Sequence, residues 1–439
     1  MADGARTLAI TEVIDRGRMT PTQVMVAALC ATALFVDGYD IQVMALAVPS
    51  LAKAWALPPS SFGLALSAVV IGISVGAGLI GPVGDRIGRR VMLIGAMVTI
   101  GLATAGTALA ATPGQFVVWR LLTGAALGAG IPSCAALTSE YAPLARRSMV
   151  MGLMNVTSPI GAFAAGFIAP PVLEAFGWRE TFLIGGAAPL VIAGLVCWLA
   201  PESLKFLLVR RPKDPRIVKI LGRIAPDVDP SIVAVGIVEE GAPHASPLAL
   251  LRAPFLGRTL LLWLMLNLNF FILYVLISWL PTLLGQSGWS LAAASQGAVL
   301  IQGGGVVGGL TMARFLDRGE TRQTLVVGFL LSAACLGLFM IVHGGVAWVA
   351  LLLLLGAGVS GSQLSLNALT AAYYPPAIKA TGVAWALLIG GIGSIVAPMA
   401  GAWMLKAHLS TITILGLLAI PALINAACVG LMRQEWQAH

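Results

Sequence analysis

The amino-acid sequence predicts an all-α membrane protein in which twelve transmembrane helices form two six-helix bundles. Three observations predict this class: a very apolar composition, continuous apolar runs of helical length, and one hydrophilic stretch that separates six runs from six. Of the 439 residues, 58% are hydrophobic and only 10% are charged, whereas about 25% are charged in an average soluble protein. Because so few charges cannot cover a protein of this size, the composition excludes an ordinary soluble enzyme and a disordered chain.

Each apolar run has the length that a helix needs to cross the hydrocarbon core, about 20 residues. Transmembrane strands would instead alternate apolar with polar residues. The lipid bilayer is therefore an expected partner of the outer surface. The twelve expected spans are residues 23–49, 61–81, 91–111, 116–139, 149–172, 181–200, 257–283, 292–315, 323–342, 346–371, 381–404 and 410–432.

The spans divide the chain into five expected regions. They are a cytoplasmic N-terminal segment (1–22), a first six-helix bundle (23–200), a cytoplasmic central loop (201–255), a second six-helix bundle (256–432) and a cytoplasmic tail (433–439). The first segment lacks the apolar core and the cleavage site of a secretory signal. An Asp-Arg pair recurs in corresponding loops of the two halves, at Asp85-Arg86 and Asp317-Arg318. Such a repeat is typical of two related bundles around a central cavity.

The distribution of Lys and Arg predicts the orientation. If both termini are cytoplasmic, 22 of the 26 Lys and Arg residues lie on the inner side. Lys53, Arg179 and Lys406 lie outside, and Arg120 lies within a span. Basic residues gather in cytoplasmic loops, so we expect both termini inside. The net charge of +8 then reflects topology, and no nucleic-acid partner is expected.

Two acidic residues in the first span are candidates for a proton-binding site. Ionisable groups within a bilayer are costly and are functional candidates by default. Asp37 and Asp40 are three residues apart, so they share one helix face. Two carboxylates so close in a low dielectric do not both ionise easily, so one of them can hold a proton. The depth of Arg120 along the fourth span is expected to bring it near this pair, where a purely structural salt bridge is the alternative.

Glu140 lies about 30 Å along the same helix from Arg120, and therefore at the cytoplasmic mouth. A gate and a solvated helix end are both open interpretations. The segment 81–90 is expected to form a tight cytoplasmic turn that contacts the facing bundle. We interpret its charged residues, with those of the matching loop, as a conformational latch that holds the inside closed: Asp85, Arg86, Arg89, Arg90, Asp317 and Arg318.

Polar side chains in the seventh, eighth and tenth spans are candidates for the other wall of the cavity. Tyr274 and Trp279 have rings that can stack on a planar ligand. Hydrogen bonding between helices is the competing interpretation. The five cysteines lie in apolar runs without a close Cys or His partner, so neither a disulfide nor a metal site is expected. The candidates are Asn267, Asn269, Tyr274, Ser278, Trp279, Gln302, Gln363, Ser365 and Asn367.

Several motifs resemble the major facilitator superfamily, and within it the aromatic acid:proton symporters. The resemblance runs from about Ile14 to the last span. The superfamily motifs are Gly84-Asp85-Arg86-x-Gly88-Arg89-Arg90, Arg120-x-x-x-Gly124-x-x-x-Gly128-x-Gly130 and Pro201-Glu202-Ser203. The symporter-like motifs are Asp37-Gly38-Tyr39-Asp40, Ala136-Leu137-Thr138-Ser139-Glu140-Tyr141 with Arg146-Arg147, Phe176-Gly177-Trp178-Arg179, Ser278-Trp279-Leu280-Pro281-Thr282-Leu283-Leu284, Leu366-Asn367-Ala368-Leu369 with Tyr374-Pro375, and Ala380-Thr381-Gly382-Val383-Ala384-Trp385-Ala386-Leu387.

The resemblance implies uptake of an aromatic carboxylate, such as a hydroxybenzoate or a lignin-derived phenolic acid, together with a proton. The carrier is then expected as a monomer in the bacterial inner membrane, with no cofactor and no metal. The implied proton-coupling residues are Asp37, Asp40, Arg120 and Glu140, and a basic residue at Lys379 joins the latch. The expected substrate-binding residues are Asp40, Arg120, Asn267, Tyr274, Trp279, Gln302, Gln363 and Asn367.

One departure from the family bears on the substrate. Family members often carry an Arg in the middle of the eleventh span after an Ile-Gly pair, whereas here Ile389-Gly390 is followed by Gly391. Either the acid docks at Arg120 and neutral donors, or the substrate is larger or differently charged than a simple benzoate.

Other functions remain open at this stage. An efflux antiporter on the same fold is the nearest alternative, and Ser158-Pro159-Ile160-Gly161 in the fifth span favours import over it. A membrane receptor would not need the carboxylate pair. An intramembrane enzyme would need a metal or nucleophile constellation within a span, and the sequence has none.

Overall fold

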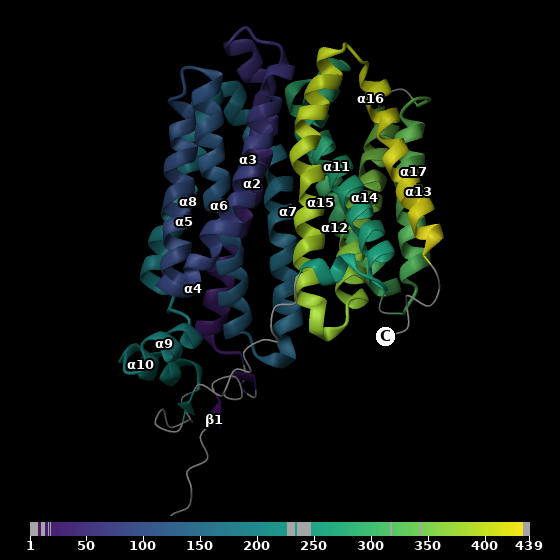
Figure 1. Cartoon of the computed structure of the whole chain (residues 1–439). Helices are drawn as coiled ribbons and strands as arrows, with labels where there is room; N and C mark the ends of the chain where they lie inside the picture. Colours follow the sequence, from purple (N-terminus) through teal and green to yellow (C-terminus); the bar gives the residue numbers. More distant parts are fainter. Residues whose placement is uncertain are drawn as a thin grey trace, which may run out of the picture. The chain divides into compact units, whose positions relative to one another are not determined.

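The computed structural model describes residues 8–9, 14–15, 17, 19–225, 233–234, 247–316, 318–342 and 345–432. This part of the chain is almost entirely helical (Figure 1). It contains twelve helical segments that are long and apolar enough to cross a membrane, which confirms the predicted class. They are Pro21–Ala54, Pro59–Ile87, Arg89–Ala108, Pro113–Tyr141, Leu144–Ala175, Trp178–Leu199, Leu256–Gln286, Leu291–Leu316, Thr321–Leu338, Gly345–Tyr373, Thr381–Lys406 and Thr411–Leu431.

Most spans consist of one α-helix, and Figure 1 labels them in chain order. Short helices α9 (Leu204–Arg210) and α10 (Arg216–Ile224) and the turn η5 (Pro247–Leu251) occupy the central loop. Strands β1 (Leu8–Ala9) and β2 (Val233–Ala234) pair in parallel. The spanning α-helices are α2 (Pro21–Ala54), α5 (Arg89–Ala108), α6 (Pro113–Tyr141), α7 (Leu144–Ala175), α8 (Trp178–Leu199), α11 (Leu256–Gln286), α12 (Leu291–Leu316), α13 (Thr321–Leu338), α14 (Gly345–Tyr373), α15 (Pro376–Lys406), α16 (Thr411–Leu417) and α17 (Ala419–Leu431).

The second span is the irregular one. It begins with η1 (Pro59–Phe62) and α3 (Gly63–Val75), passes through the π-helix η2 (Gly76–Ile80) and the 3-10 turn η3 (Gly81–Val83), and ends with α4 (Gly84–Ile87). Pro82 lacks a backbone N–H, and proline interrupts the regular hydrogen-bond ladder of an α-helix. The span nevertheless continues about six residues past the predicted end at residue 81. The turn predicted over residues 81–90 is shorter in the structure and is centred on Gly88. The φ of Gly88 is 109°, which glycine adopts readily.

The chain forms two compact units. Unit 1 comprises Met1–Gly38, Ile71–Gly161 and Phe182–Gly241, and unit 2 comprises Tyr39–Val70, Ala162–Thr181 and Ala242–His439. Parts of α2, α7, α8 and the second span therefore belong to each unit. The division into bundles 23–200 and 256–432 stays a prediction.

Glycines let helix backbones touch inside each unit. In unit 1, a Cβ at Gly72 would lie 2.4 Å from the carbonyl oxygen of Leu121, and one at Gly128 would lie 2.1 Å from that of Ile73. In unit 2, Gly304 and Leu353 meet in the same way, at 2.0 Å. Small residues are the usual means of close helix approach in membranes. The glycine-rich runs thus set the packing of the second span on α6 and of α12 on α14.

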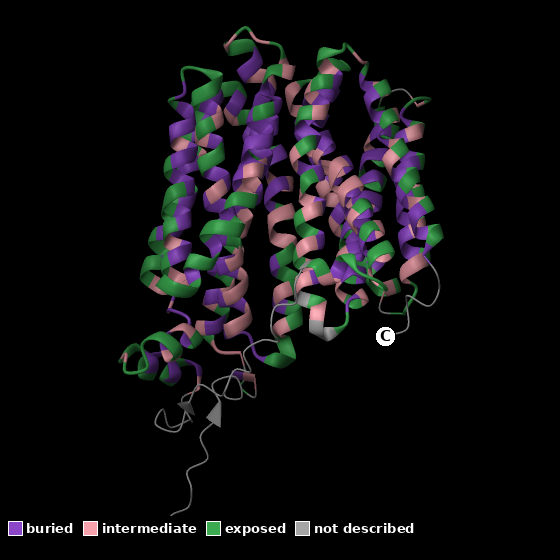
Figure 2. Cartoon of the chain, in the orientation of Figure 1, coloured by how far each residue is buried: buried purple, intermediate pink, exposed green. Residues whose placement is uncertain are grey.

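Exposed residues are spread along the helices (Figure 2), and many of them are large and apolar. Trp198 on α8, for example, is 84% exposed and Leu102 on α5 is 58% exposed. Surfaces of this kind face lipid in a membrane protein.

Candidate functional site

Asp37 and Asp40 are both buried in the middle of α2. Their exposed fractions are 2% and 5%. A carboxylate this buried faces neither lipid nor bulk water, because either surrounding would leave it accessible. The structure thus places both predicted acidic residues in the protein interior, where a change of protonation alters the cost of burial.

Gly38, between the two acids, is the point where α2 touches α7. A Cβ at Gly38 would lie 1.9 Å from the carbonyl oxygen of Ser158, and a Cβ at Gly161 would lie 1.9 Å from that of Phe35. The crossing is therefore reciprocal, and only glycine fits on either helix. Sequence reasoning treated Gly38 and Gly161 only as parts of motifs. Nothing in the sequence pairs these two positions, because the first and fifth spans are brought together only by the fold.

Arg120 on α6 is fully buried, with an exposed fraction of 0%. Its guanidinium carbon lies 5.6 Å from the ring centroid of Phe182 on α8, within the range of a cation–π interaction. Phe116 stands edge-on to the same ring at 5.7 Å between centroids. Unit 1 therefore holds a buried cation beside aromatic rings. The expected approach of Arg120 to the acidic pair stays a prediction.

The thiols of Cys30 on α2 and Cys134 on α6 meet in the interior of unit 1. Both residues are free thiols, both are 1% exposed, and their side chains are hydrogen-bonded to each other. The Asp37 carboxylate lies near enough to interact electrostatically with Cys134. The sequence suggested no partner for either cysteine, because 104 positions separate them along the chain and only the packing of two spans brings them together.

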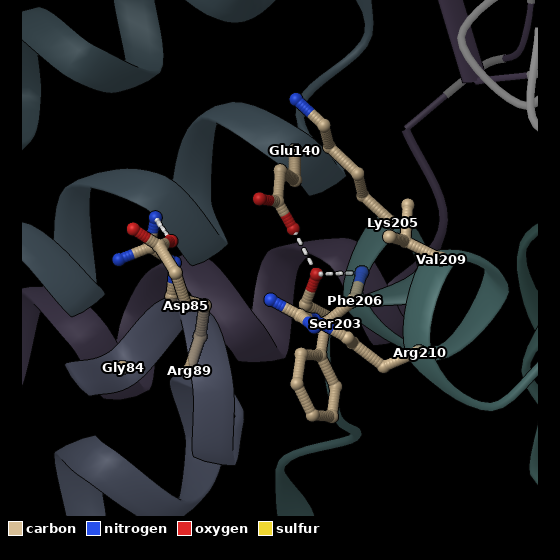
Figure 3. Close-up of a pocket in the computed structure, with 9 residues that line it drawn as sticks. All are labelled: Gly84, Asp85, Arg89, Glu140, Ser203, Lys205, Phe206, Val209 and Arg210. Carbon is tan, nitrogen blue, oxygen red and sulfur yellow. Dashed lines mark hydrogen bonds and ion pairs between the residues drawn. The ribbon is translucent and has the colours of Figure 1, made fainter. Parts of the chain in front are cut away.

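Glu140 lies at the end of α6, in a cavity of about 180 Å³ within unit 1 (Figure 3). Its carboxylate accepts a hydrogen bond from the Ser203 hydroxyl. The Ser203 oxygen in turn accepts from the backbone N–H of Phe206 at 3.0 Å and so caps α9. Glu140 is thus attached to the central loop, and its role as a gate stays a prediction. The cavity is lined by Gly84, Asp85, Arg89, Glu140, Ser203, Lys205, Phe206, Val209 and Arg210.

Glu202 joins the central loop to the start of α5. Its carboxylate accepts the backbone N–H of Arg90 at 3.0 Å and that of Ser203 at 2.9 Å. The Tyr141 hydroxyl donates to the Glu202 carbonyl oxygen at 2.6 Å. A Cβ at Gly88 would lie 2.5 Å from the Glu202 carboxylate, so glycine is needed there. The negative charge sits at a helix N-terminus, where it is favourable. Sequence reasoning missed this role and named Glu202 only within a motif.

The predicted latch residues have contacts within their own units. Asp85 forms an ion pair with Arg89 across the Gly88 turn. The Arg90 guanidinium donates to the carbonyl oxygens of Val196 and Cys197 at the end of α8. The expected partner was a helix end of the facing bundle, whereas this end of α8 belongs to the same unit as Arg90. Among the others, Arg86 and Lys379 are exposed, Arg318 lies over the Phe315 ring at 5.8 Å, and Asp317 is outside the described residues. The latch function stays a prediction.

An amide relay connects α11 and α14 in unit 2. The side-chain N–H of Asn269 donates to the Gln363 carbonyl at 2.8 Å, and Gln363 donates to Asn367 at 3.1 Å. Asn269 and Gln363 are buried, and Asn367 is half-buried. Because each amide donates to the next, the amide N–H groups of Asn367 stand at the more accessible end of the relay. We call these three residues the amide relay.

Two of the predicted substrate residues mainly join helices. Trp279 is 1% exposed, and its indole N–H donates to the Pro398 carbonyl at 2.9 Å. Its ring lies against Gly401, where a Cβ would be 2.2 Å away. The ring therefore packs between α11 and α15, and its part in substrate binding stays a prediction. Asn267 donates to the Ile389 carbonyl at 3.0 Å.

Tyr274 and Gln302 are half-buried, and the Tyr274 ring lies 6.3 Å from that of Phe270. Their part in substrate binding stays a prediction. Gly391 is also half-buried, and a Cβ there would meet nothing within 4 Å. The position at which the resemblance leads us to expect an Arg therefore has open space at its Cβ.

Comparisons with known proteins agree with this architecture. The sequence matches the Major Facilitator Superfamily over residues 30–398 and 298–435. It is 34% identical over 436 residues to the 4-hydroxybenzoate transporter PcaK of Acinetobacter baylyi, covering 97% of this chain and 94% of that protein. It is 32% identical over 430 residues to a gallate transporter of Pseudomonas putida, covering 96% and 94%. The inward-open structure of the xylose transporter XylE from E. coli aligns with a TM-score of 0.73 at 17% identity, over 93% of this chain and 96% of that one.

Proposed function

Because the chain belongs to the Major Facilitator Superfamily, we propose that it imports an aromatic carboxylate together with a proton by alternating access. The chain is a multi-pass membrane transporter. Relatives that match nearly all of it are named for 4-hydroxybenzoate and for gallate. We place the carrier in the bacterial inner membrane as a monomer, with both termini in the cytoplasm.

The burial of Asp37 and Asp40 is the observation that carries the proposal. A charged carboxylate is costly in the interior of a membrane protein, and binding a proton removes that cost. A carrier that must pass through an occluded state is therefore helped by protonation of one of these groups. Proton entry from the outside and release to the inside would then drive accumulation of the substrate.

We assign the substrate carboxylate to Arg120, the fully buried cation of unit 1. Charge-assisted hydrogen bonds between a guanidinium and a carboxylate are strong and geometrically specific. The rings of Phe116 and Phe182 next to Arg120 provide apolar surface of the kind that an aromatic acid needs.

In this proposal, Glu140 and the Asp85–Arg89 ion pair act in the step that opens the carrier to the cytoplasm. The carboxylate of Glu140 is held by Ser203 of the central loop. Release of that contact would free α9 from the end of α6. We assign the Glu140–Ser203 contact to a cytoplasmic gate, and we propose that this contact breaks when the carrier opens to the inside.

Uptake by purified carrier in liposomes tests the proposal. We expect radiolabelled 4-hydroxybenzoate to accumulate when the outside is acidic and the inside neutral, and a protonophore to abolish accumulation. An efflux antiporter would instead expel substrate from the vesicle under that gradient. Accumulation that is equal with and without the proton gradient would contradict the proposed proton coupling.

A further inference from the structure

The central loop carries a dense group of positive charges on α9, α10 and the residues between them. We call this group the basic ridge: Lys205, Arg210, Arg211, Lys213, Arg216, Lys219 and Arg223. All seven residues are exposed. Between residues 204 and 225 the single acidic residue is Asp214, which is hydrogen-bonded to Arg216 at 2.7 Å. The surface therefore carries six net positive charges within 22 residues.

The ridge is presented outward because α10 is amphipathic. Its apolar residues recur at helical spacing and are buried, namely Ile217, Ile220, Leu221 and Ile224. The cations of α10, namely Arg216, Lys219 and Arg223, therefore lie on its exposed face. Two valines stand among them, Val209 and Val218, with exposed fractions of 56% and 57%. Exposed apolar side chains between cations suit the boundary between lipid headgroups and acyl chains.

The ridge is also held at the level of the membrane surface. The α8 span ends at Leu199 and α9 begins at Leu204, so α9 starts within about 17 Å of the end of the span. The contacts of Glu202 with Arg90 and Tyr141 attach this junction to α5 and α6. Figure 1 shows α9 and α10 beyond the ends of α4 and α5, on the side that we propose is cytoplasmic.

We propose that the basic ridge binds the headgroups of anionic phospholipids, such as phosphatidylglycerol, in the inner leaflet. A row of exposed cations at the membrane surface attracts phosphodiesters that carry a net negative charge more than zwitterionic ones. The ridge extends over two helices and has valines among its cations. This arrangement fits several lipid molecules better than one soluble anion. Lys205 and Arg210 also line the cavity with Glu140 (Figure 3). Bound lipid would therefore hold α9, and with it Ser203, in place beside Glu140.

Native mass spectrometry of the full-length carrier, with graded additions of phosphatidylglycerol or phosphatidylcholine, tests this proposal. The test variant is Arg211→Gln/Lys219→Gln/Arg223→Gln, which leaves the residues around Glu140 unchanged. The matched control is Arg146→Gln/Arg252→Gln/Arg314→Gln, which removes three exposed cations from outside the ridge. We expect the test variant to bind phosphatidylglycerol about tenfold more weakly at low salt, and the control to stay within about twofold. Added salt should weaken binding to the unchanged protein.

Several results would overturn the proposal. One is equal binding of phosphatidylglycerol and phosphatidylcholine to the unchanged carrier, and another is equal loss of binding in the two triple variants. Displacement of the lipid by soluble glycerol phosphate would assign the ridge to small anions, and displacement by an acidic peptide would assign it to a protein partner. Should the triple variant fail to fold, the single exposed change Lys219→Glu takes its place, with an expected loss of binding in the same direction.

Discussion

The two carboxylates of α2 are the residues whose chemistry can be tested most directly. Replacing Asp37 or Asp40 by Asn keeps the size and hydrogen-bonding capacity of the side chain but removes its titration. We expect either variant to lose accumulation driven by a proton gradient. Exchange of labelled for unlabelled substrate needs no net proton movement, so it should survive in at least one of them. Counterflow and gradient-driven uptake measured in the same liposomes separate the two activities.

Full gradient-driven accumulation in both Asn variants would remove these residues from proton coupling. Loss of counterflow in both, with a normal elution profile, would instead place them in substrate binding. Glu174→Gln provides a control at another acidic position, on α7, to which no transport role is assigned.

Gly391 is the second test at the scale of one residue. A Cβ built there meets nothing within 4 Å, so Gly391→Arg introduces the expected cation without a clash at its Cβ. We expect this variant to bind a simple benzoate about tenfold more tightly, because a charge-assisted hydrogen bond contributes roughly 1.5–3 kcal/mol. Binding is measured by isothermal calorimetry in detergent.

Gly391→Ala is the matched control, since it adds a methyl group without charge and should leave affinity nearly unchanged. Equal affinities in the Arg and Ala variants would mean that the missing cation does not act on the substrate of this carrier.

At the scale of elements, the crossing of α2 and α7 positions the acidic pair. A Cβ at Gly38 would overlap the backbone of Ser158 at 1.9 Å, and backbone cannot move aside as a flexible side chain can. We expect Gly38→Ala to push the two helices apart, with a large loss of uptake and a lower melting temperature. Thermal unfolding followed by intrinsic fluorescence, together with uptake, measures both.

Gly95→Ala on α5 is the control for that substitution, because a Cβ there meets nothing within 4 Å. Alanine has a higher helix propensity than glycine, so the control should be as stable as the unchanged protein or more so. A stable, fully active Gly38→Ala carrier would contradict the proposed role of the crossing.

The junction of α5, α6 and α9 is a second element whose strength can be measured. The Tyr141 hydroxyl is buried and donates to the Glu202 carbonyl at 2.6 Å. Tyr141→Phe removes that bond and leaves a buried carbonyl with one partner fewer. We expect a loss of about 1 kcal/mol in stability, measured as a lower melting temperature. An unchanged melting temperature would show that the hydrogen bond does not stabilise the junction.

At the scale of the whole molecule, the charge distribution predicts the orientation in the membrane. With 22 of 26 Lys and Arg residues on one side, both termini are expected in the cytoplasm. A green fluorescent protein fused after His439 should fluoresce, and alkaline phosphatase at the same position should be inactive. The opposite pair of results would place the C-terminus outside the cytoplasm, and it would reverse the direction of transport that we propose.

The sequence by itself determined the class of the molecule and the places of its spans. Hydrocarbon imposes a length of about 20 apolar residues and intrahelical hydrogen bonding on every crossing segment, so the twelve runs could be recognised one at a time. Charged residues within those runs were conspicuous for the same reason, and burial of Asp37, Asp40 and Arg120 agrees with that reading. These are properties of single segments, and a local pattern is enough to predict them.

Tertiary structure alone decided which residues meet. The Cys30–Cys134 contact, the cap that Glu202 provides for α5 and the enclosure of Trp279 against Gly401 depend on how separate helices are rotated and offset. Apolar periodicity is weak in a span that has lipid on one side and protein on the other, so it does not specify that rotation. Close packing at glycine crossings specifies it instead, because two backbones in contact permit only one register.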